Sequence, residues 1–260
     1  MPTSNQIALV TGATAGIGNA FARALAARGT DLVLVARDAE RLEAVAAALR
    51  AEHGVDVEVL VADLVDRAQL ETVAERLRDG ARPVGVLVNN AGFAVKQWFV
   101  GGDVAAEERL LDVLVRAVLV LSAAATPGMV ERGRGAVVTV SSVAGFLPGG
   151  TYSAAKAWAT TFTMSLAAEL RGSGVTATAL CPGYVHTEFH GRAGIRMERL
   201  PEWVWLDADE LVAQCLRDVE RGRSISVPGR LYKLAVVAQR HLPLRLVEWF
   251  AGGRMRRRHR

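Results

Sequence analysis

The 260-residue chain is predicted to fold as an α/β protein, with a doubly wound parallel sheet covered by helices on both faces. Two observations indicate this fold. Short apolar runs alternate with helical patterns from end to end, and a glycine-rich segment follows the first apolar run. With 51% hydrophobic residues, the chain can bury one full core. A second domain of this kind is not expected.

The elements are expected in a regular order. The predicted strands are residues 6–10, 32–36, 55–61, 84–88, 136–140, 175–180 and 224–227. The predicted helices are residues 16–28, 38–52, 66–79, 104–131, 152–171 and 207–221, the last with Asp207 as its N-cap. Residues 184–206 break this alternation with turn residues, two His and two Trp. Because a long irregular stretch in a compact domain is usually functional, we predict a substrate loop there.

The glycine motif lies at the turn between the first strand and the first helix. It reads Thr11-Gly-Ala-Thr-Ala-Gly-Ile-Gly18. Gly12 allows a tight turn, and Gly16 and Gly18 allow the backbone to approach a pyrophosphate at the positive end of the helix dipole. The spacing differs from the common Gly-x-Gly-x-x-Gly, so an ordinary strand-to-helix turn remains an alternative. We predict a dinucleotide site formed by Gly12, Thr14, Gly16, Ile17 and Gly18.

The end of the second predicted strand indicates which dinucleotide is preferred. Ala36 and Arg37 stand where an acid would bind the ribose 2′-hydroxyl of NAD. A guanidinium matches the oxygens of a 2′-phosphate, and a carboxylate would repel them. This favours NADP, although Arg37 could also be an ordinary solvated residue before the next helix.

Tyr152 and Lys156 are four residues apart and share one face of a predicted helix. An ammonium beside a phenol favours the ionised phenol, which would make Tyr152 an acid usable near neutral pH. An unperturbed Tyr titrates near ~10, so a pKa of about 7 requires on the order of 4 kcal/mol. The pair predicts proton transfer by Tyr152 with Lys156 as its partner.

Composition limits the other classes of protein. The two cysteines, Cys181 and Cys215, indicate no disulfide framework, and the N-terminus has no export signal, so we expect a cytoplasmic protein. The apolar stretch 110–125 contains Asp112 and Arg116 and is short for a membrane span, so a buried helix is expected. No Gly-x-Ser-x-Gly elbow of a hydrolase occurs in the chain.

The net charge of +4 is unevenly distributed. Ten basic residues and one acid from Arg223 onward contribute +9, which leaves −5 for the first 222 residues. Because the basic residues belong to the tail, nucleic-acid binding is not expected. Residues 230–260 are predicted to form an amphipathic helical extension with a basic tail. It either rests on an anionic membrane or a partner subunit, or completes the fold with a solvated end.

The motifs together resemble the short-chain dehydrogenase/reductase family over residues 6–229. Further motifs that carry the resemblance are Asp63-Leu64, Asn89-Asn90-Ala91-Gly92, Ser141-Ser142 and Pro182-Gly183-Tyr184-Val185-His186-Thr187, which follow the third, fourth, fifth and sixth predicted strands. The resemblance implies a Rossmann-like fold and an activity like that of ketoreductases or hydroxysteroid dehydrogenases.

The resemblance also implies roles for these residues. Ser142 would bind the substrate oxygen, Tyr152 would be the acid/base, and Lys156 would lower the Tyr pKa and hold the nicotinamide ribose. Asp63 and Leu64 would meet the adenine, and Val185 and Thr187 would position the carboxamide. The remaining implied cofactor-binding residues are Asn90, Ala91, Gly92, Pro182 and Gly183.

Two features depart from the family pattern. Leu114 stands where the family has an Asn that helps to hold a water linking the Lys to solvent, so proton delivery is expected to be weaker than hydride transfer. The water could instead be held by backbone carbonyls, or the alignment could be off by one turn. Only ten residues separate Ser142 from Tyr152, so the pocket wall at 143–151 is expected to be short.

Other residues offer weaker candidates. His186 and His190, with Glu188 between them, could suggest a metal, but ligands at i and i+4 need a helix and this segment follows Pro-Gly, so no metal site is expected. An apolar lid is one reading of Phe189, Trp203 and Trp205, and packing is the other.

The sequence thus predicts an NADP(H)-dependent homo-oligomeric oxidoreductase interconverting a ketone and a secondary alcohol on an apolar small molecule. The alternative is a cofactor-binding protein with little turnover.

Overall fold

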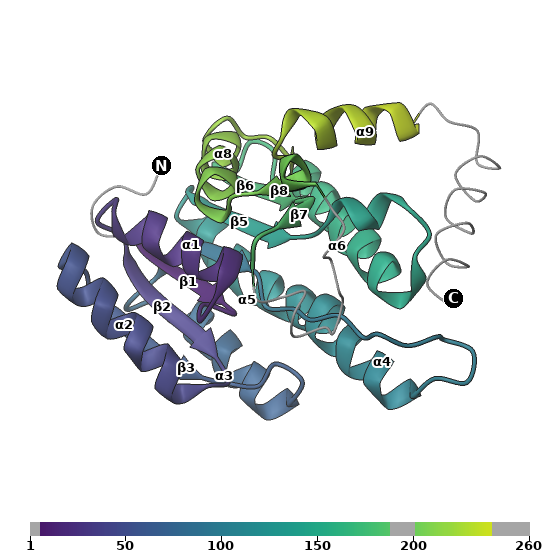
Figure 1. The fold of residues 1–260 in the computed structure, drawn as a ribbon. Coiled ribbons are helices and arrows are strands. Elements are labelled where there is room, and N and C mark those ends of the chain that lie inside the picture. Colours follow the sequence, from purple (N-terminus) through teal and green to yellow (C-terminus); the bar gives the residue numbers. More distant parts are fainter. Residues whose placement is uncertain (1–5, 188–200, 241–260) are drawn as a thin grey trace.

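Seven parallel strands form the central sheet of the computed structural model, which describes residues 6–187 and 201–240 (Figure 1). The strands lie in the order β3-β2-β1-β4-β5-β6-β9. Their bounds are β1 (Ile7–Thr11), β2 (Asp31–Ala36), β3 (Val57–Val61), β4 (Val84–Asn89), β5 (Gly135–Val140), β6 (Val175–Leu180) and β9 (Ile225–Ser226). The chain moves outward in opposite directions from β1 and β4, so a crevice for ligands is expected at the carboxyl ends of these two strands. The predicted doubly wound parallel sheet is confirmed.

Helices cover both faces of the sheet, as the sequence predicted (Figure 1). One face carries α1 (Gly16–Ala26), α2 (Ala39–His53) and α8 (Ala208–Glu220), and the other carries α3 (Arg67–Arg78), α5 (Ala117–Glu131) and α6 (Gly150–Glu169). Aspartates begin three of these helices, because Asp38, Asp66 and Asp207 accept hydrogen bonds from backbone amides of the first turn. The N-cap expected at Asp207 is confirmed.

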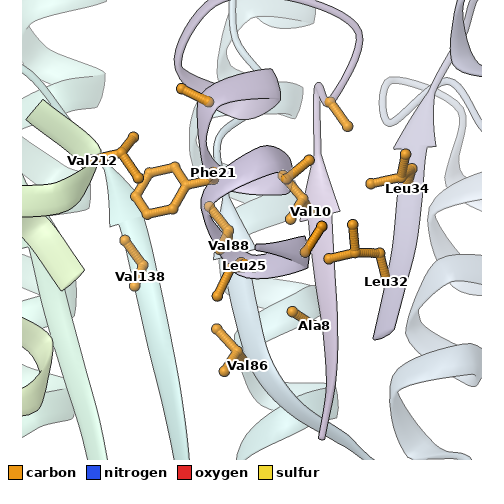
Figure 2. Close-up of a cluster of buried hydrophobic side chains, with 14 of the residues drawn as sticks. Ala8, Val10, Phe21, Leu25, Leu32, Leu34, Val86, Val88, Val138 and Val212 are labelled. Carbon is orange, nitrogen blue, oxygen red and sulfur yellow. The ribbon is translucent and has the colours of Figure 1, made fainter. Parts of the chain in front are cut away.

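The sheet separates the hydrophobic core into two large clusters, one on each face, because successive strand residues point to opposite faces. In β1, Ala8 and Val10 join the cluster under α1, while Leu9 joins the cluster on the other face. Figure 2 shows Phe21 of α1 packed over the strand residues and beside Val212 of α8. Phe21 is fully buried, and removing such a ring costs about 3–5 kcal/mol. This packing holds α1 in place directly after the glycine-rich segment.

The helix expected at 104–131 is interrupted. It consists of α4 (Val104–Leu111), a π turn η1 (Asp112–Arg116) and α5. A single helix was predicted because this stretch is apolar on most sides, so the one-residue shift of a π turn does not change its appearance. Such π turns are frequent at functional sites, and this one holds Leu114.

Residues Val104–Glu131 are long and apolar enough to cross a membrane by length and composition. Half of the most apolar window is buried inside the fold, however. Its inward residues belong to the same cluster as β4 and β5, and they are Val113, Ala117, Leu121, Ala124, Ala125 and Met129. The predicted buried helix is therefore what the structure shows.

The predicted substrate loop begins and ends in a small parallel sheet. β7 (Tyr184–Val185) pairs with β8 (Trp205–Leu206), which follows a 3₁₀ turn, η3 (Glu202–Val204). Phe189 and His190 lie outside the described residues. Of the C-terminal extension, α9 (Arg230–Arg240) is described, and it lies near β7 and β8 in Figure 1. The rest of the extension, including the basic tail, lies outside the described residues.

Candidate active site

The glycine-rich loop joins β1 to α1 at the carboxyl end of β1, where the strand order reverses. Gly12 and Gly16 have φ values of +68° and +54°, in the left-handed region that favours glycine. A Cβ on Gly18 would lie 2.3 Å from both the Gly12 carbonyl oxygen and Asn90 Nδ2. Ala15 precedes α1 and makes no side-chain cap hydrogen bond to the first amides of this helix. The loop therefore fits the diphosphate of a dinucleotide.

Two glycines of this loop make room for neighbouring protein atoms. Gly18 makes room for the loop itself and for Asn90, and its predicted contact with the ligand stays a prediction. Gly16 makes room for Thr187, because a Cβ there would lie 2.9 Å from Thr187 Cγ2. Thr14 and Ile17, also predicted to contact the cofactor, lie half-buried in the same loop and first turn.

Thr11 and Asn90 join the ends of β1 and β4. Thr11 Oγ1 accepts hydrogen bonds of 3.0 Å from the amides of both Asn90 and Ala91. Asn90 Nδ2 donates to the carbonyl oxygens of Thr11 and Gly12 at 2.9 and 3.1 Å. The Asn90 side chain therefore holds the glycine-rich loop in place. Thr11 was not predicted as a site residue, and its position between the first strand and the first glycine was the available signal.

Arg37 follows directly after β2, as predicted, and faces solvent with 73% of its side chain exposed. Its Nη1 lies 3.8 Å from Asp63 Oδ2, which is a loose ion pair. An exposed pair of this kind contributes about 0–1 kcal/mol, so a doubly charged phosphate can compete for the guanidinium. Leu64, next to Asp63, is buried in the core instead of lining the edge of the sheet.

Three residues come together between the carboxyl end of β5 and the amino-terminal half of α6, namely Ser142, Tyr152 and Lys156. Ser142 is hydrogen-bonded to Tyr152, and its Oγ also accepts the Ala144 amide at 3.1 Å. Lys156 is 5% exposed, and its Nζ donates to the Val140 carbonyl at 2.7 Å. The same Nζ lies 5.8 Å from the centroid of the Tyr152 ring. The structure thus brings together the three residues that the sequence singled out for catalysis.

The pKa of Tyr152 moves in the direction opposite to the prediction. Burial of the phenol raises the Tyr152 pKa to about 12, and the hydrogen bond from Ser142 only partly offsets this. Burial also lowers the pKa of the Lys156 ammonium to about 8, although the nearby Cys181 raises it. The expected lowering of the Tyr152 pKa was wrong for this structure, because desolvation of the phenol is the largest influence on it. A high pKa keeps Tyr152 protonated and able to donate at neutral pH.

Leu114 lies beside Lys156, at the position expected for it. It is 2% exposed and packs in a small apolar cluster with Phe93 and Tyr152. A Cβ on Gly92 would lie 2.8 Å from Leu114 Cδ2 and 3.9 Å from Lys156 Nζ. The Leu114 side chain and the ammonium thus both lie close to Gly92, and Leu114 stands where the family pattern has an amide.

The segment 182–187 runs beside the glycine-rich loop. The Pro182 carbonyl accepts the Val143 amide at 2.9 Å, next to Ser142. Val185 is buried and Thr187 contacts Gly16. The segment predicted to position the carboxamide therefore links the catalytic serine to the glycine-rich loop.

Tyr232 of α9 was missed by the sequence analysis. Its hydroxyl hydrogen-bonds the backbone on both sides of the substrate loop, accepting the Tyr184 amide at 3.1 Å and donating to the Val204 carbonyl at 2.7 Å. The only signal available was the apolar i, i+4 pair Tyr232 and Val236 on a helix that mixes apolar and basic residues.

The wall at 143–151 forms a 3₁₀ turn, η2 (Val143–Phe146), and a short link to α6. A hollow of about 450 Å³ opens beside it, lined by residues including Phe146, Leu147 and Ala157. Because Ser153, Ala154 and Ala157 lie on the side of α6 roughly opposite Tyr152, the hollow does not face the phenol.

The aromatic residues near the loop have separate roles. Trp203 is 70% exposed, while the ring of Trp205 stacks on His186 with centroids 4.5 Å apart. His186 Nε2 lies 2.9 Å from Glu202 Oε1, so an acid across the loop is its partner.

Comparison with known proteins agrees with this geometry. Residues 6–196 match the short chain dehydrogenase family. The chain is 36% identical over 192 residues to a very-long-chain 3-oxoacyl-CoA reductase from Anas platyrhynchos, a match that covers 70% of this chain and 60% of that protein's length.

Two solved structures are similar over nearly the whole chain. A short-chain dehydrogenase from Sphingobium yanoikuyae in complex with NADPH is 40% identical with a TM-score of 0.82, covering 96% of this chain and 93% of that one. A bulky-bulky ketone specific alcohol dehydrogenase from Comamonas testosteroni is 31% identical with a TM-score of 0.78, covering 97% and 93%. With the Ser142, Tyr152 and Lys156 geometry, these matches show that the chain belongs to the short chain dehydrogenase family of oxidoreductases.

Proposed function

We propose that the protein is an NADP(H)-dependent oxidoreductase that interconverts a ketone and a secondary alcohol on an apolar small molecule. The observation that carries this proposal is the meeting of Ser142, Tyr152 and Lys156 beside a glycine-rich loop that fits a diphosphate. The similar Sphingobium structure in complex with NADPH and the similar ketone-specific Comamonas enzyme support it.

Ser142, Tyr152 and Lys156 have separate roles in carbonyl reduction. When bound, the nicotinamide supplies a hydride to the carbonyl carbon. Negative charge then develops on the carbonyl oxygen, and Ser142 can turn its hydroxyl hydrogen from Tyr152 to that oxygen, so that both hydroxyls donate to it. Tyr152 passes its proton to the alkoxide, and its raised pKa keeps that proton in place beforehand. Lys156, close to the Tyr152 ring, stabilises the phenolate that remains.

The preference for NADP rests on Arg37. It is exposed at the end of β2, and its only described ion pair, with Asp63, is loose. We expect NADPH to bind more tightly than NADH in a fluorescence titration. Arg37→Ala should weaken NADPH binding about tenfold or more and leave NADH nearly unchanged, because only NADPH carries the 2′-phosphate. Tighter binding of NADH by the wild type would overturn this part of the proposal.

The apolar class of substrate rests on the surroundings of Tyr152. The phenol borders a cluster of apolar side chains, namely Phe93, Val95, Leu110, Leu114, Val115 and Ala155. A bulky apolar ketone would complete these contacts, whereas a sugar-like substrate would leave its hydroxyls without partners there. We expect a higher kcat/KM for bulky apolar ketones than for polyhydroxy ketones in an assay of NADPH consumption.

Leu114 favours a second candidate function, a cofactor-binding protein with little turnover. The carbon side chain beside Lys156 removes the amide that would support proton delivery. Tight NADPH binding without oxidation by any ketone in the panel would favour this second function.

Three further proposals concern the assembly and location of the protein. We propose a homo-oligomer, supported by exposed apolar residues on α4, α5 and α6. We propose a cytoplasmic location, supported by the buried free thiols of Cys181 and Cys215. The exposed leucines of α9, Leu231 and Leu234, support peripheral membrane contact, which sedimentation with anionic liposomes tests.

A further inference from the structure

Tyr232 of α9 fills the space next to Gly183. It is 9% exposed and lies on the same helix face as the buried Val236. A Cβ on Gly183 would lie 2.0 Å from Tyr232 Cζ and 2.3 Å from two further ring carbons. Any larger residue at 183 would therefore displace either the ring or the backbone. Gly183 is one of the residues that the family resemblance assigns to the cofactor site.

The hydroxyl of Tyr232 connects two separate segments. It accepts a 3.1 Å hydrogen bond from the Tyr184 amide and donates a 2.7 Å hydrogen bond to the Val204 carbonyl. Tyr184 begins β7, and Val204 directly precedes β8, its partner strand. One phenol thus ties both strands of this small sheet to α9.

The segment 182–187 pairs with β8 through β7, and further hydrogen bonds hold its backbone among the described residues. Its backbone is held at Pro182 by the Val143 amide and at His186 by the Leu206 carbonyl. The Tyr184 amide, midway between them, is held by Tyr232. Of these three hydrogen bonds, only the middle one depends on a side chain, and that side chain comes from the C-terminal extension.

We propose that Tyr232 is a positioning residue for the bound nicotinamide cofactor, acting through the backbone of residues 182–187. The helix α9 is thereby part of the cofactor site, although it lies outside the part of the chain that matches the family. The inference rests on the proposed function, because it takes residues 182–187 as the segment that receives the nicotinamide end. If the segment is left loose, only the fraction of molecules with the correct backbone binds tightly, and the apparent affinity falls by that fraction.

The test compares Tyr232→Phe with the wild type. The Phe ring still fills the space beside Gly183 but cannot hydrogen-bond Tyr184 or Val204. We expect the Kd for NADPH to rise about three- to tenfold, with faster amide hydrogen exchange in residues 182–187 measured without cofactor. Leu234→Ala, an exposed position on the same helix, is the matched control and should change neither value.

A double-mutant cycle tests the packing of the ring. Gly183→Ala should weaken NADPH binding strongly in the wild type, where the new Cβ meets the Tyr232 ring. The same change should have a much smaller effect in a Tyr232→Ala background, where the ring is absent. This cycle keeps the inference testable if Tyr232→Phe does not fold.

The outcomes separate this inference from the proposed function. Wild-type affinity and exchange in Tyr232→Phe, or equal effects of Gly183→Ala in both backgrounds, would overturn the role of Tyr232. If the wild type binds neither NADPH nor NADH, the proposed function fails. Hydrogen exchange then still shows whether Tyr232 holds the segment, and unchanged exchange would overturn the inference as well.

Discussion

Leu114 is the residue that most distinguishes this site from the family pattern. Its side chain and Lys156 Nζ both lie close to Gly92, and the ammonium donates to the Val140 carbonyl. Proton resupply to Tyr152 through Lys156 is therefore expected to limit turnover.

Restoring an amide should relieve this limit. We expect Leu114→Asn to raise kcat and reduce the solvent isotope effect, because the new amide can hold water next to Lys156. It should also lower the melting temperature, since a polar group placed in the Leu110, Leu114 and Phe93 cluster costs about 1–3 kcal/mol. A destabilised enzyme that is no faster would mean that the proton takes another path.

Lys156 should give the stability of the protein a specific pH dependence. Its pKa falls from 10.5 to about 8 on folding, because burial disfavours the charged form. Between these values the unfolded chain holds a proton that the folded protein has released, so stability rises with pH across this window. The contribution is present above 10.5 and is lost as the pH falls to about 8.

Urea unfolding of wild type and Lys156→Met from pH 7 to 10.5 measures this contribution. The free energy of unfolding of the wild type should gain up to about 3 kcal/mol relative to the variant between pH 8 and 10.5. Parallel pH profiles would show that Lys156 keeps an ordinary pKa in the folded protein.

The contact between the glycine-rich loop and α1 depends on a missing side chain. A Cβ on Gly18 would lie 2.3 Å from the Gly12 carbonyl and from Asn90 Nδ2, the groups that fix the loop. We expect Gly18→Ala to cost about 1–3 kcal/mol of stability and to weaken NADPH binding, because α1 must move away from the loop. Gly80→Ala is the matched control, since no atom lies within 4 Å of its Cβ position. Normal binding by Gly18→Ala would contradict the close packing described for this turn.

Most elements were predictable because their signals are local. Strands buried on both faces appear as apolar runs, and the caps at Asp38, Asp66 and Asp207 stand directly before their helices. The spacing of Tyr152 and Lys156 places both on one side of α6 whatever surrounds them. By contrast, the π turn at Asp112–Arg116 interrupts a helix whose apolar pattern continues unchanged. The packing of α9 was hidden because the partners of Tyr232 lie far away in the sequence.

Electrostatic properties were the least predictable part of the site. The sequence placed an ammonium near the phenol of Tyr152 and so predicted a lowered pKa. How deeply both groups are buried depends on Leu114, Phe93 and the rest of the fold, and this burial reverses the direction of the shift.

The exposed apolar residues of the whole molecule gather in part on the helices α4, α5 and α6. They include Leu111, Leu119, Val130 and Met164, which are 38–46% exposed. We expect light scattering at micromolar concentration to give a mass above that of the 27.8 kDa chain. Leu119→Glu should lower the mass, whereas Val237→Glu on α9, where the residue is 54% exposed, should not. A monomeric wild type would refute the proposed oligomer.

We propose that this molecule reduces ketones with NADPH and that Tyr152 donates the proton. Single-turnover oxidation of enzyme-bound NADPH, followed by absorbance, tests this most directly with a panel of bulky apolar ketones for wild type and Tyr152→Phe. We expect oxidation by the wild type and a rate at least about a hundredfold lower for Tyr152→Phe, with NADPH affinity nearly unchanged. No oxidation by any ketone despite tight NADPH binding, or equal rates for the two proteins, would contradict it.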